Sequence, residues 1–223
     1  MNKNQFRFHL LVTSIVAFAS MIYEFIFAHI LSILRGGTIL NYTLTIAIFT
    51  FCLGLGSLSY DSLKLRFSKN KVFINTEFLL SIVGITAPLL ILITPVDLIF
   101  FGFRTDIFIT YLGIIAVGFL SGIELPYLLD VNKNVGVVLS ADYLGMFIAS
   151  SVFAWYLLPT FGILGLSVIV GLLNLICACF FLKNKSIKIV CVGTVFVLFI
   201  VTIILIPELN LIGMKLFAGK YNV

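Results

Sequence analysis

Gly118-Phe-Leu-Ser-Gly-Ile-Glu-Leu-Pro126 places an acid, Glu124, inside an otherwise apolar helix. A carboxylate within a membrane span costs roughly 2.5 kcal/mol or more to insert, so it is expected to face the bundle interior and to have a function. Pro126 follows two residues later, and its ring and missing N–H loosen the helix and free a nearby carbonyl. The acid and the freed backbone predict a polar pocket for a cation, and a purely structural kink is the alternative interpretation.

Small residues recur at helical spacing on this segment and on the next one. Gly118 and Gly122 stand four residues apart, and the following apolar segment has Ala141, Gly145 and Ala149 at the same spacing. Small side chains allow two membrane helices to approach closely. We therefore predict a close crossing between these two faces.

The composition of the whole chain identifies a membrane protein. Of 223 residues, 61% are hydrophobic and only 10% are charged, and no water-soluble domain of this size could bury so much apolar surface. The formal net charge of +5 is expected to set membrane topology rather than to bind nucleic acid. The four cysteines lie in apolar runs without His at ligand spacing, so neither a metal site nor a cofactor is expected.

Long apolar segments predict an all-α, polytopic membrane bundle of seven transmembrane helices that forms one domain, residues 1–223. The first residues resemble a signal peptide, but apolar residues continue to Leu34, which favours a retained helix. The expected spans lie at about residues 8–34, 40–60, 73–95, 107–129, 138–159, 162–182 and 187–206.

The basic residues orient these spans. Most of the fourteen Lys and Arg residues fall on one side of the predicted bundle, which marks that side as cytoplasmic. We therefore expect a multi-pass protein of the bacterial plasma (inner) membrane with its N-terminus inside and its C-terminus outside. After the last span, Asn210 to Ala218 is expected to lie along the membrane interface as an amphipathic helix.

Four acids fall inside predicted spans. At about 1.5 Å of rise per residue, Glu77, Glu124 and Asp142 share a layer roughly 9–14 Å from the cytoplasmic ends of their helices, whereas Glu24 lies near mid-membrane. For Glu77 and Asp142 the alternative is an acid at the inner interface that pairs with Lys71 or Lys133 or caps a helix.

Carboxylates gathered in one low-dielectric site cannot all stay ionised without compensation. Either some are protonated or a cation shares the site, and an amine with two or more charges would suit it. We predict a ligand-binding cavity between the first, fourth and fifth spans, with two tyrosines as hydroxyl partners and one outlying acid: Glu24, Glu124, Asp142, Tyr23, Tyr143 and, as the outlying member, Glu77.

Seven short motifs, in this order and spacing, resemble the transmembrane portion of the prokaryotic membrane-bound spermidine synthase-like proteins. They cover nearly the whole chain: Tyr23-Glu24, Gly54-Leu-Gly56-Ser57, Glu77, Gly118 to Pro126, Asp142-Tyr143-Leu-Gly145, Leu158-Pro159 with Gly162, and Leu173-Asn174. The resemblance implies a membrane domain that usually precedes an aminopropyltransferase domain, which binds decarboxylated S-adenosylmethionine and a polyamine. No strand with a Gly-rich loop follows the last span, so we expect that the catalytic domain is missing and assign no aminopropyl transfer.

Three classes of function remain. The resemblance favours a non-catalytic membrane module that binds or docks a polyamine, a lipid-like ligand or a separately encoded partner enzyme. The layer of acids also fits a small transporter or channel for a cationic metabolite, although seven spans without evident inverted repeats weigh against it. An intramembrane enzyme with paired carboxylates as acid and base is the third class. The lipid bilayer is a partner in every case.

Overall fold

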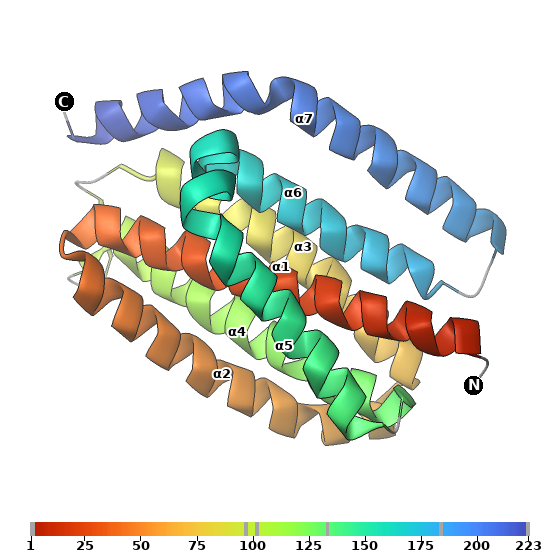
Figure 1. The fold of residues 1–223 in the computed structure, drawn as a ribbon. Coiled ribbons are helices and arrows are strands. Elements are labelled where there is room, and N and C mark those ends of the chain that lie inside the picture. The colour runs from red at the N-terminus through yellow and green to blue at the C-terminus, as the bar shows by residue number, and fades with distance from the viewer. Residues whose placement is uncertain (1–2, 96–97, 101–102, 133, 183–184, 222–223) are drawn as a thin grey trace.

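Seven long helices make up the molecule, as Figure 1 shows for the computed structural model, which describes residues 3–95, 98–100, 103–132, 134–182 and 185–221. The all-α architecture expected from the sequence is confirmed. The helices are α1 (Lys3–Arg35), α2 (Thr38–Arg66), α3 (Lys69–Ile93), α4 (Thr105–Asn132), α5 (Val135–Val152), α6 (Leu158–Phe180) and α7 (Lys185–Tyr221).

Six helical stretches of the described chain are long and apolar enough to cross a membrane. The count is six rather than seven because the π-helical turn η1 (Phe153–Leu157) joins α5 to α6 in one continuous stretch, Val135–Phe180. The chain nevertheless reverses there, and α5 and α6 run in opposite directions (Figure 1). Gly162 permits the reversal with φ 63° and ψ 177°, a backbone conformation that residues with a Cβ avoid.

Helix α1 lies at the centre of the bundle and packs against α2, α4, α5 and α6. Its middle is largely buried, as expected for a helix surrounded by others, and Ile22, Ile26 and Ile30 are fully buried. The expected first span, residues 8–34, lies within this helix. A polar group in this middle stretch, such as the carboxyl group of Glu24, therefore lies inside the protein.

The predicted crossing of α4 on α5 is wrong. A Cβ on Gly118 would lie 2.9 Å from the carbonyl oxygen of Phe49, and one on Gly122 would clash with the backbone of Leu53, so both glycines pack on α2. Gly145 of α5 instead meets the backbone of Ser14 in α1. Small residues mark where a backbone approaches closely, but their spacing does not say which helix approaches.

Helix α7 lies at the edge of the bundle and packs mainly on α6. It continues through Pro207 to Tyr221, so the separate helix expected from Asn210 to Ala218 is instead part of α7. The two ends of the chain lie at opposite ends of the bundle (Figure 1), as an odd number of crossings requires.

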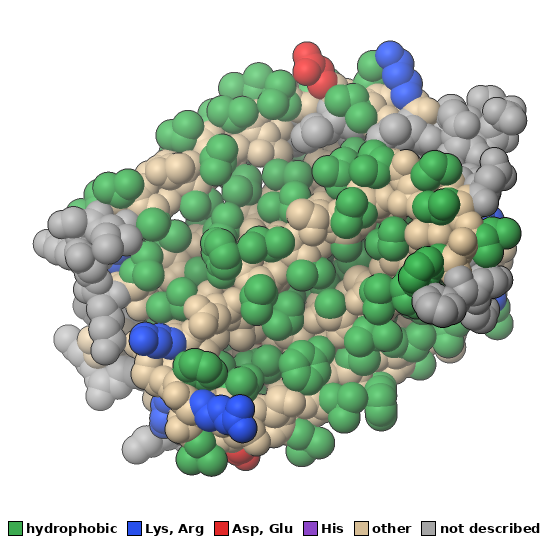
Figure 2. All heavy atoms as spheres, turned by 180° about the vertical axis from the view of Figure 1, so that it is seen from behind, with side chains coloured by type: hydrophobic (Ala, Val, Ile, Leu, Met, Phe, Trp, Pro, Cys, Tyr) green, Lys and Arg blue, Asp and Glu red, His purple; other side chains and the backbone are tan. Residues whose placement is uncertain are grey.

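The rear face of the molecule is dominated by apolar side chains, and its charged side chains lie at the margins (Figure 2). This distribution suits a protein surrounded by lipid. Several helices also extend beyond the expected spans. Helix α2, for example, ends at Arg66 rather than near residue 60 because long basic side chains reach the headgroup region from the end of a span.

A short antiparallel hairpin precedes α4 and was not expected from the sequence. Strand β1 (Ile99–Phe100) pairs with β2 (Phe103–Arg104). Arg104 donates a hydrogen bond to the carbonyl of Leu34 at the end of α1, 3.3 Å away. The hairpin thus fastens the start of α4 to the end of the central helix.

Candidate functional site

A cavity of about 300 Å³ lies among α1, α2, α4 and α5. Each of three of these helices contributes one carboxyl group: Glu24 from α1, Glu124 from α4 and Asp142 from α5. The structure therefore brings together the three acids that the sequence assigned to one cavity, and adds α2 to its wall. Four hydroxyl groups complete the polar lining, from Ser20, Thr50, Ser121 and Tyr143.

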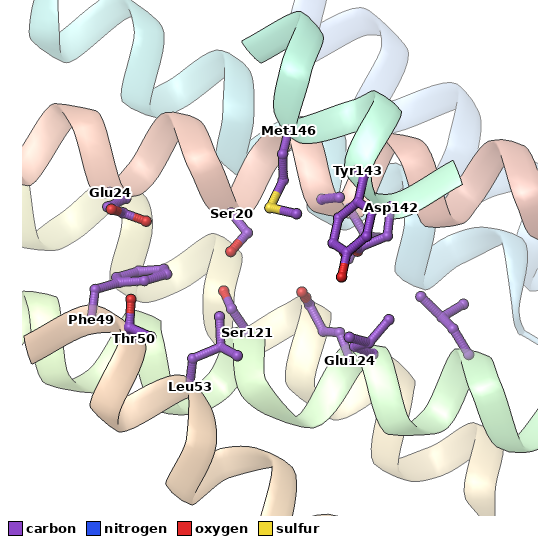
Figure 3. A pocket seen from close by; sticks show the side chains of 14 residues that line it. Ser20, Glu24, Phe49, Thr50, Leu53, Ser121, Glu124, Asp142, Tyr143 and Met146 are labelled. Carbon is purple, nitrogen blue, oxygen red and sulfur yellow. The ribbon is translucent and has the colours of Figure 1, made fainter. Parts of the chain in front are cut away.

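The carboxyl groups form two poles. In Figure 3, Glu24 lies toward one end of the cavity, and Glu124 and Asp142 lie toward the other. Glu124 and Asp142 are close enough for the charge of one to affect the other. Ser20 and Ser121 point into the space between the poles (Figure 3).

Two contacts, one from α1 to α5 and one from α1 to the adjoining turn η1, fix the distance between the poles. The Ser14 hydroxyl donates to the carbonyl of Ala141 at 2.7 Å, and the rings of Phe25 and Phe153 stand 5.0 Å apart. The two helices run in the same direction, and residues that lie side by side in them differ by 127 to 128 in residue number. Asp142 therefore lies level with Ser14 or Ile15. Glu24 lies nine to ten residues farther along, roughly 14 Å at the rise of an α-helix.

Polar groups on the wall lack partners in the described part of the chain. Glu124 is 3% exposed and Ser121 is 5% exposed. Neither Oε1 of Glu124 nor Oγ of Ser121 has a hydrogen-bond partner. Buried polar groups in folded proteins are nearly always hydrogen-bonded, so these two unpartnered atoms indicate a site that binds a ligand.

Glu77 of α3 lies behind Glu124 rather than on the cavity wall. It is completely buried and lies within hydrogen-bonding range of Glu124, but its carboxyl oxygens accept no hydrogen bond from any other group among the described residues. The ion pairs among the described residues do not include Glu77, so the alternative pairing with Lys71 is absent there. Lys133, the alternative partner of Asp142, lies outside the described residues.

The two predicted tyrosines differ. Tyr143 lines the cavity and is 60% exposed, so it stands at the mouth. Tyr23 is not part of the wall, and its hydroxyl donates to the carbonyl of Leu80 at 3.4 Å. The ring of Tyr23 packs instead against Gly84 of α3, on the side of α1 that faces that helix.

The sequence interpretation missed the two serines. Ser20 stands four residues before Glu24, and Ser121 stands three before Glu124. At these spacings helical side chains share a face, so a polar residue one turn from an intramembrane acid was an available signal. Among the residues that the structure describes, no group of three or more His, Cys, Asp or Glu side chains could hold a metal ion. The arrangement suits an organic cation that is bound by carboxylates and hydroxyls.

Bacterial proteins named polyamine aminopropyltransferase match most of the chain. The protein of Oceanobacillus iheyensis is 31% identical over 174 residues, which is 73% of this chain and 32% of that protein. The protein of Leptospira interrogans is 28% identical over 72% of this chain and 32% of its own length. Polyamine aminopropyltransferase 2 of Aquifex aeolicus is 27% identical over 81% of this chain and 38% of its own length.

The chain thus spans about a third of the length of the curated relatives it matches. No protein-family model and no solved structure matches it. The resemblance that was inferred from the motifs is confirmed by the relatives.

Proposed function

We propose, from the premise that this chain is a relative of one segment of the polyamine aminopropyltransferases, that it is a membrane module which binds a linear polyamine such as spermidine. The observation that supports this most directly is the cavity whose wall carries Glu24, Glu124 and Asp142 and, among its described residues, no Lys, Arg or His. We further propose that the module lies in the bacterial inner membrane with its N-terminus in the cytoplasm.

The balance of charge favours a cationic ligand. An ionised carboxylate in a membrane span is costly unless a positive charge or several donors accompany it. Glu124 lacks a partner for Oε1, and none of the described ion pairs involves Glu24 or Asp142. An ammonium group would supply both the missing charge and the missing N–H donors.

The shape of the cavity favours a long cation over a compact one. The poles are separated by roughly 14 Å along the helices, and side chains that reach inward shorten the gap. Spermidine has nine bonds between its terminal nitrogens, which at about 1.2 Å each extends to roughly 11 Å. Between the poles the wall includes Val16, Leu53 and Met146, which suit the methylene groups of such a chain.

The role that we propose is binding rather than transfer. The names of the relatives describe proteins about three times as long as the matched segment, so their activity is not assigned to this segment alone. Binding here would hold a polyamine, or dock a partner, beside an aminopropyltransferase unit in the same assembly.

Calorimetric titration of the purified protein in lipid nanodiscs with spermidine tests the proposal. The wild type is expected to bind, and Glu124→Gln is expected to weaken binding at least tenfold because one charged partner, about 1.4 kcal/mol or more, is lost. Asp61→Asn is the matched control because Asp61 lies outside the cavity and its side chain is 78% exposed. Failure of the wild type to bind, or unchanged binding in Glu124→Gln, would overturn the proposal.

The length of the ligand gives a sharper test. Glu24→Gln removes the pole at the far end of the cavity, so it should weaken binding of spermidine while leaving the much weaker binding of butylamine unchanged. Equal losses for both amines would show that the ligand does not extend between the two poles.

A further inference from the structure

Glu77 and Glu124 form a pair of buried carboxyl groups in the core of the described bundle. Glu77 is 0% exposed and Glu124 is 3% exposed. The two carboxyl groups lie within hydrogen-bonding range of each other, and three of their four oxygens accept no hydrogen bond from any other described group. Neither takes part in any of the ion pairs that the structure describes.

An independent observation beside the pair indicates a ligand. Ser121, one turn before Glu124 on α4, is 5% exposed and lines the cavity, yet its hydroxyl oxygen has no partner. In Figure 3 this hydroxyl points into the cavity on the same side as Glu124. The pair therefore borders a space in which a ligand could form a hydrogen bond with the unpartnered Ser121 hydroxyl.

The other titratable groups around the pair cannot neutralise it. Tyr23 of α1, Tyr127 of α4 and Cys177 of α6 face Glu77, and Asp142 of α5 faces Glu124. None of these side chains becomes a cation. The hydroxyl of Tyr23 donates to the carbonyl of Leu80, and that of Tyr127 donates to Oδ1 of Asn70 at 3.3 Å. The described interactions of the pair include no titratable group of α2 or α7.

Two carboxyl groups in contact in a site of low dielectric cannot both be ionised, because desolvation and mutual repulsion both favour the protonated form. In the empty cavity the pair must therefore keep at least one proton. An ammonium group at Glu124 changes this balance, since it attracts both negative charges and donates N–H groups to unpartnered oxygens.

We infer that the Glu77–Glu124 pair holds one proton when the cavity is empty and releases it when an ammonium group binds, so that the protein exchanges a proton for an amine. The inference rests on the proposed function. The amine enters as R–NH3⁺ and keeps all its protons and bonds. The proton on the pair breaks its O–H bond and leaves to water, so one positive charge enters for one that leaves.

Exchange of this kind links affinity to pH. Where the empty pair holds one proton and the occupied pair holds none, the affinity for the amine rises tenfold for each unit of pH. Glu77 acts in this scheme through Glu124 and does not touch the amine. It is a positioning residue. Its role is measured by the number of protons released when spermidine binds, and not by the affinity alone.

The experiment is calorimetric titration of the protein in nanodiscs with spermidine at about pH 6.5, where the amines are protonated. It is run in two buffers with different enthalpies of ionisation, since the difference in observed heat counts the protons released. The wild type is expected to release at least one proton per spermidine. Asp61→Asn, the surface control, should do the same.

In Glu77→Gln the new amide donates a hydrogen bond to the Glu124 carboxylate and takes the place of the proton. This variant should bind spermidine, release about one proton fewer than the wild type and show a weaker pH dependence of affinity. Binding by the wild type without proton release would overturn the exchange but leave the proposed function standing, and absence of binding would overturn the proposed function. Release of as many protons by Glu77→Gln as by the wild type would overturn the assignment to Glu77. If this variant fails to fold, the wild-type pH titration decides, because an affinity that does not change with pH overturns the inference.

Discussion

Two acids of this protein are equally buried and are accommodated in opposite ways. Asp106, at the start of α4, and Glu77, in α3, are both 0% exposed. Asp106 accepts hydrogen bonds from Nη2 of Arg104 at 2.8 Å and from the backbone N–H of Ile107 at 2.7 Å. Glu77 has a second carboxyl group beside it, that of Glu124, and accepts no hydrogen bond from any other group among the described residues. The first acid is compensated within the protein, and the second is left for a proton or a ligand to compensate.

The difference follows from position along a helix. The first backbone N–H groups of a helix have no partner within it, and the helix dipole favours negative charge there, so Asp106 finds donors at once. Glu77 lies inside a helix, where the backbone N–H groups already bond within the helix. Only another helix could supply a donor, and α4 supplies Glu124 instead.

The largest expected effect is at the compensated acid. Arg104→Leu leaves Asp106 buried without its cation and also removes the bond to Leu34, so it should destabilise the protein by about 3 kcal/mol. Arg35→Leu is the control because Arg35 is exposed and bonds only to the hydroxyl of Tyr111 in the described structure. Denaturant unfolding in mixed micelles measures both. Equal, small losses would show that Asp106 needs no cation.

The next effect tests the close packing of α4, the helix that carries Glu124, on α2. Gly122→Leu forces a side chain into the backbone of Leu53 and should cost about 2 kcal/mol. Gly54→Leu is the matched control on α2, since a Cβ there meets no atom within 4 Å. Unfolding midpoints compare the two variants. Unchanged stability in Gly122→Leu would contradict the close approach of α2 and α4.

A smaller effect of opposite sign is expected at Glu77. Glu77→Met keeps the length of the side chain and removes an uncompensated buried acid, so it should stabilise the empty protein by about 1 kcal/mol. The midpoint of thermal unfolding without polyamine measures this gain. Destabilisation comparable to that of Arg104→Leu would show that Glu77 has a structural partner and would remove the contrast with Asp106.

The smallest effect belongs to an acid at the bundle surface. Asp130 accepts from the hydroxyl of Tyr60 at 2.9 Å and pairs with Lys69 at 2.9 Å, but its side chain is 29% exposed. Asp130→Asn should cost about 0.5 kcal/mol, and salt should reduce the difference. Unfolding at low and high ionic strength checks both points. A loss as large as that of Arg104→Leu would show that exposure does not govern the value of these pairs.

Much of the fold was predictable because the signals are local. Apolar runs of sufficient length predict helices without any knowledge of neighbours, and the expected spans 138–159 and 162–182 placed a reversal between residues 159 and 162. The pairing of α4 with α2 was not predictable. Gly122 says only that some backbone comes close, and the choice between α2 and α5 depends on the shape of the complete bundle.

The residues of the candidate site were also predictable only in part from the sequence. The cost of an acid in lipid was enough to single out Glu24, Glu124 and Asp142 and to predict that they face inward. The place of Tyr23 against α3 was not predictable from helix spacing, because consecutive helical residues can line one cavity, as Asp142 and Tyr143 do. The hydroxyl of Ser121 and the contribution of α2 became visible only in the assembled bundle.

By itself, the sequence determined the class of protein, the helices and the acids that had to be buried, because hydrophobicity and the cost of charge act on each residue separately. The tertiary structure decided which acids meet. It gave Asp106 an arginine and gave Glu77 another carboxyl group, although both are fully buried. That outcome depends on the packing of residues far apart in the chain, and the partner of a charge determines whether its burial stabilises the fold or leaves a site to be filled.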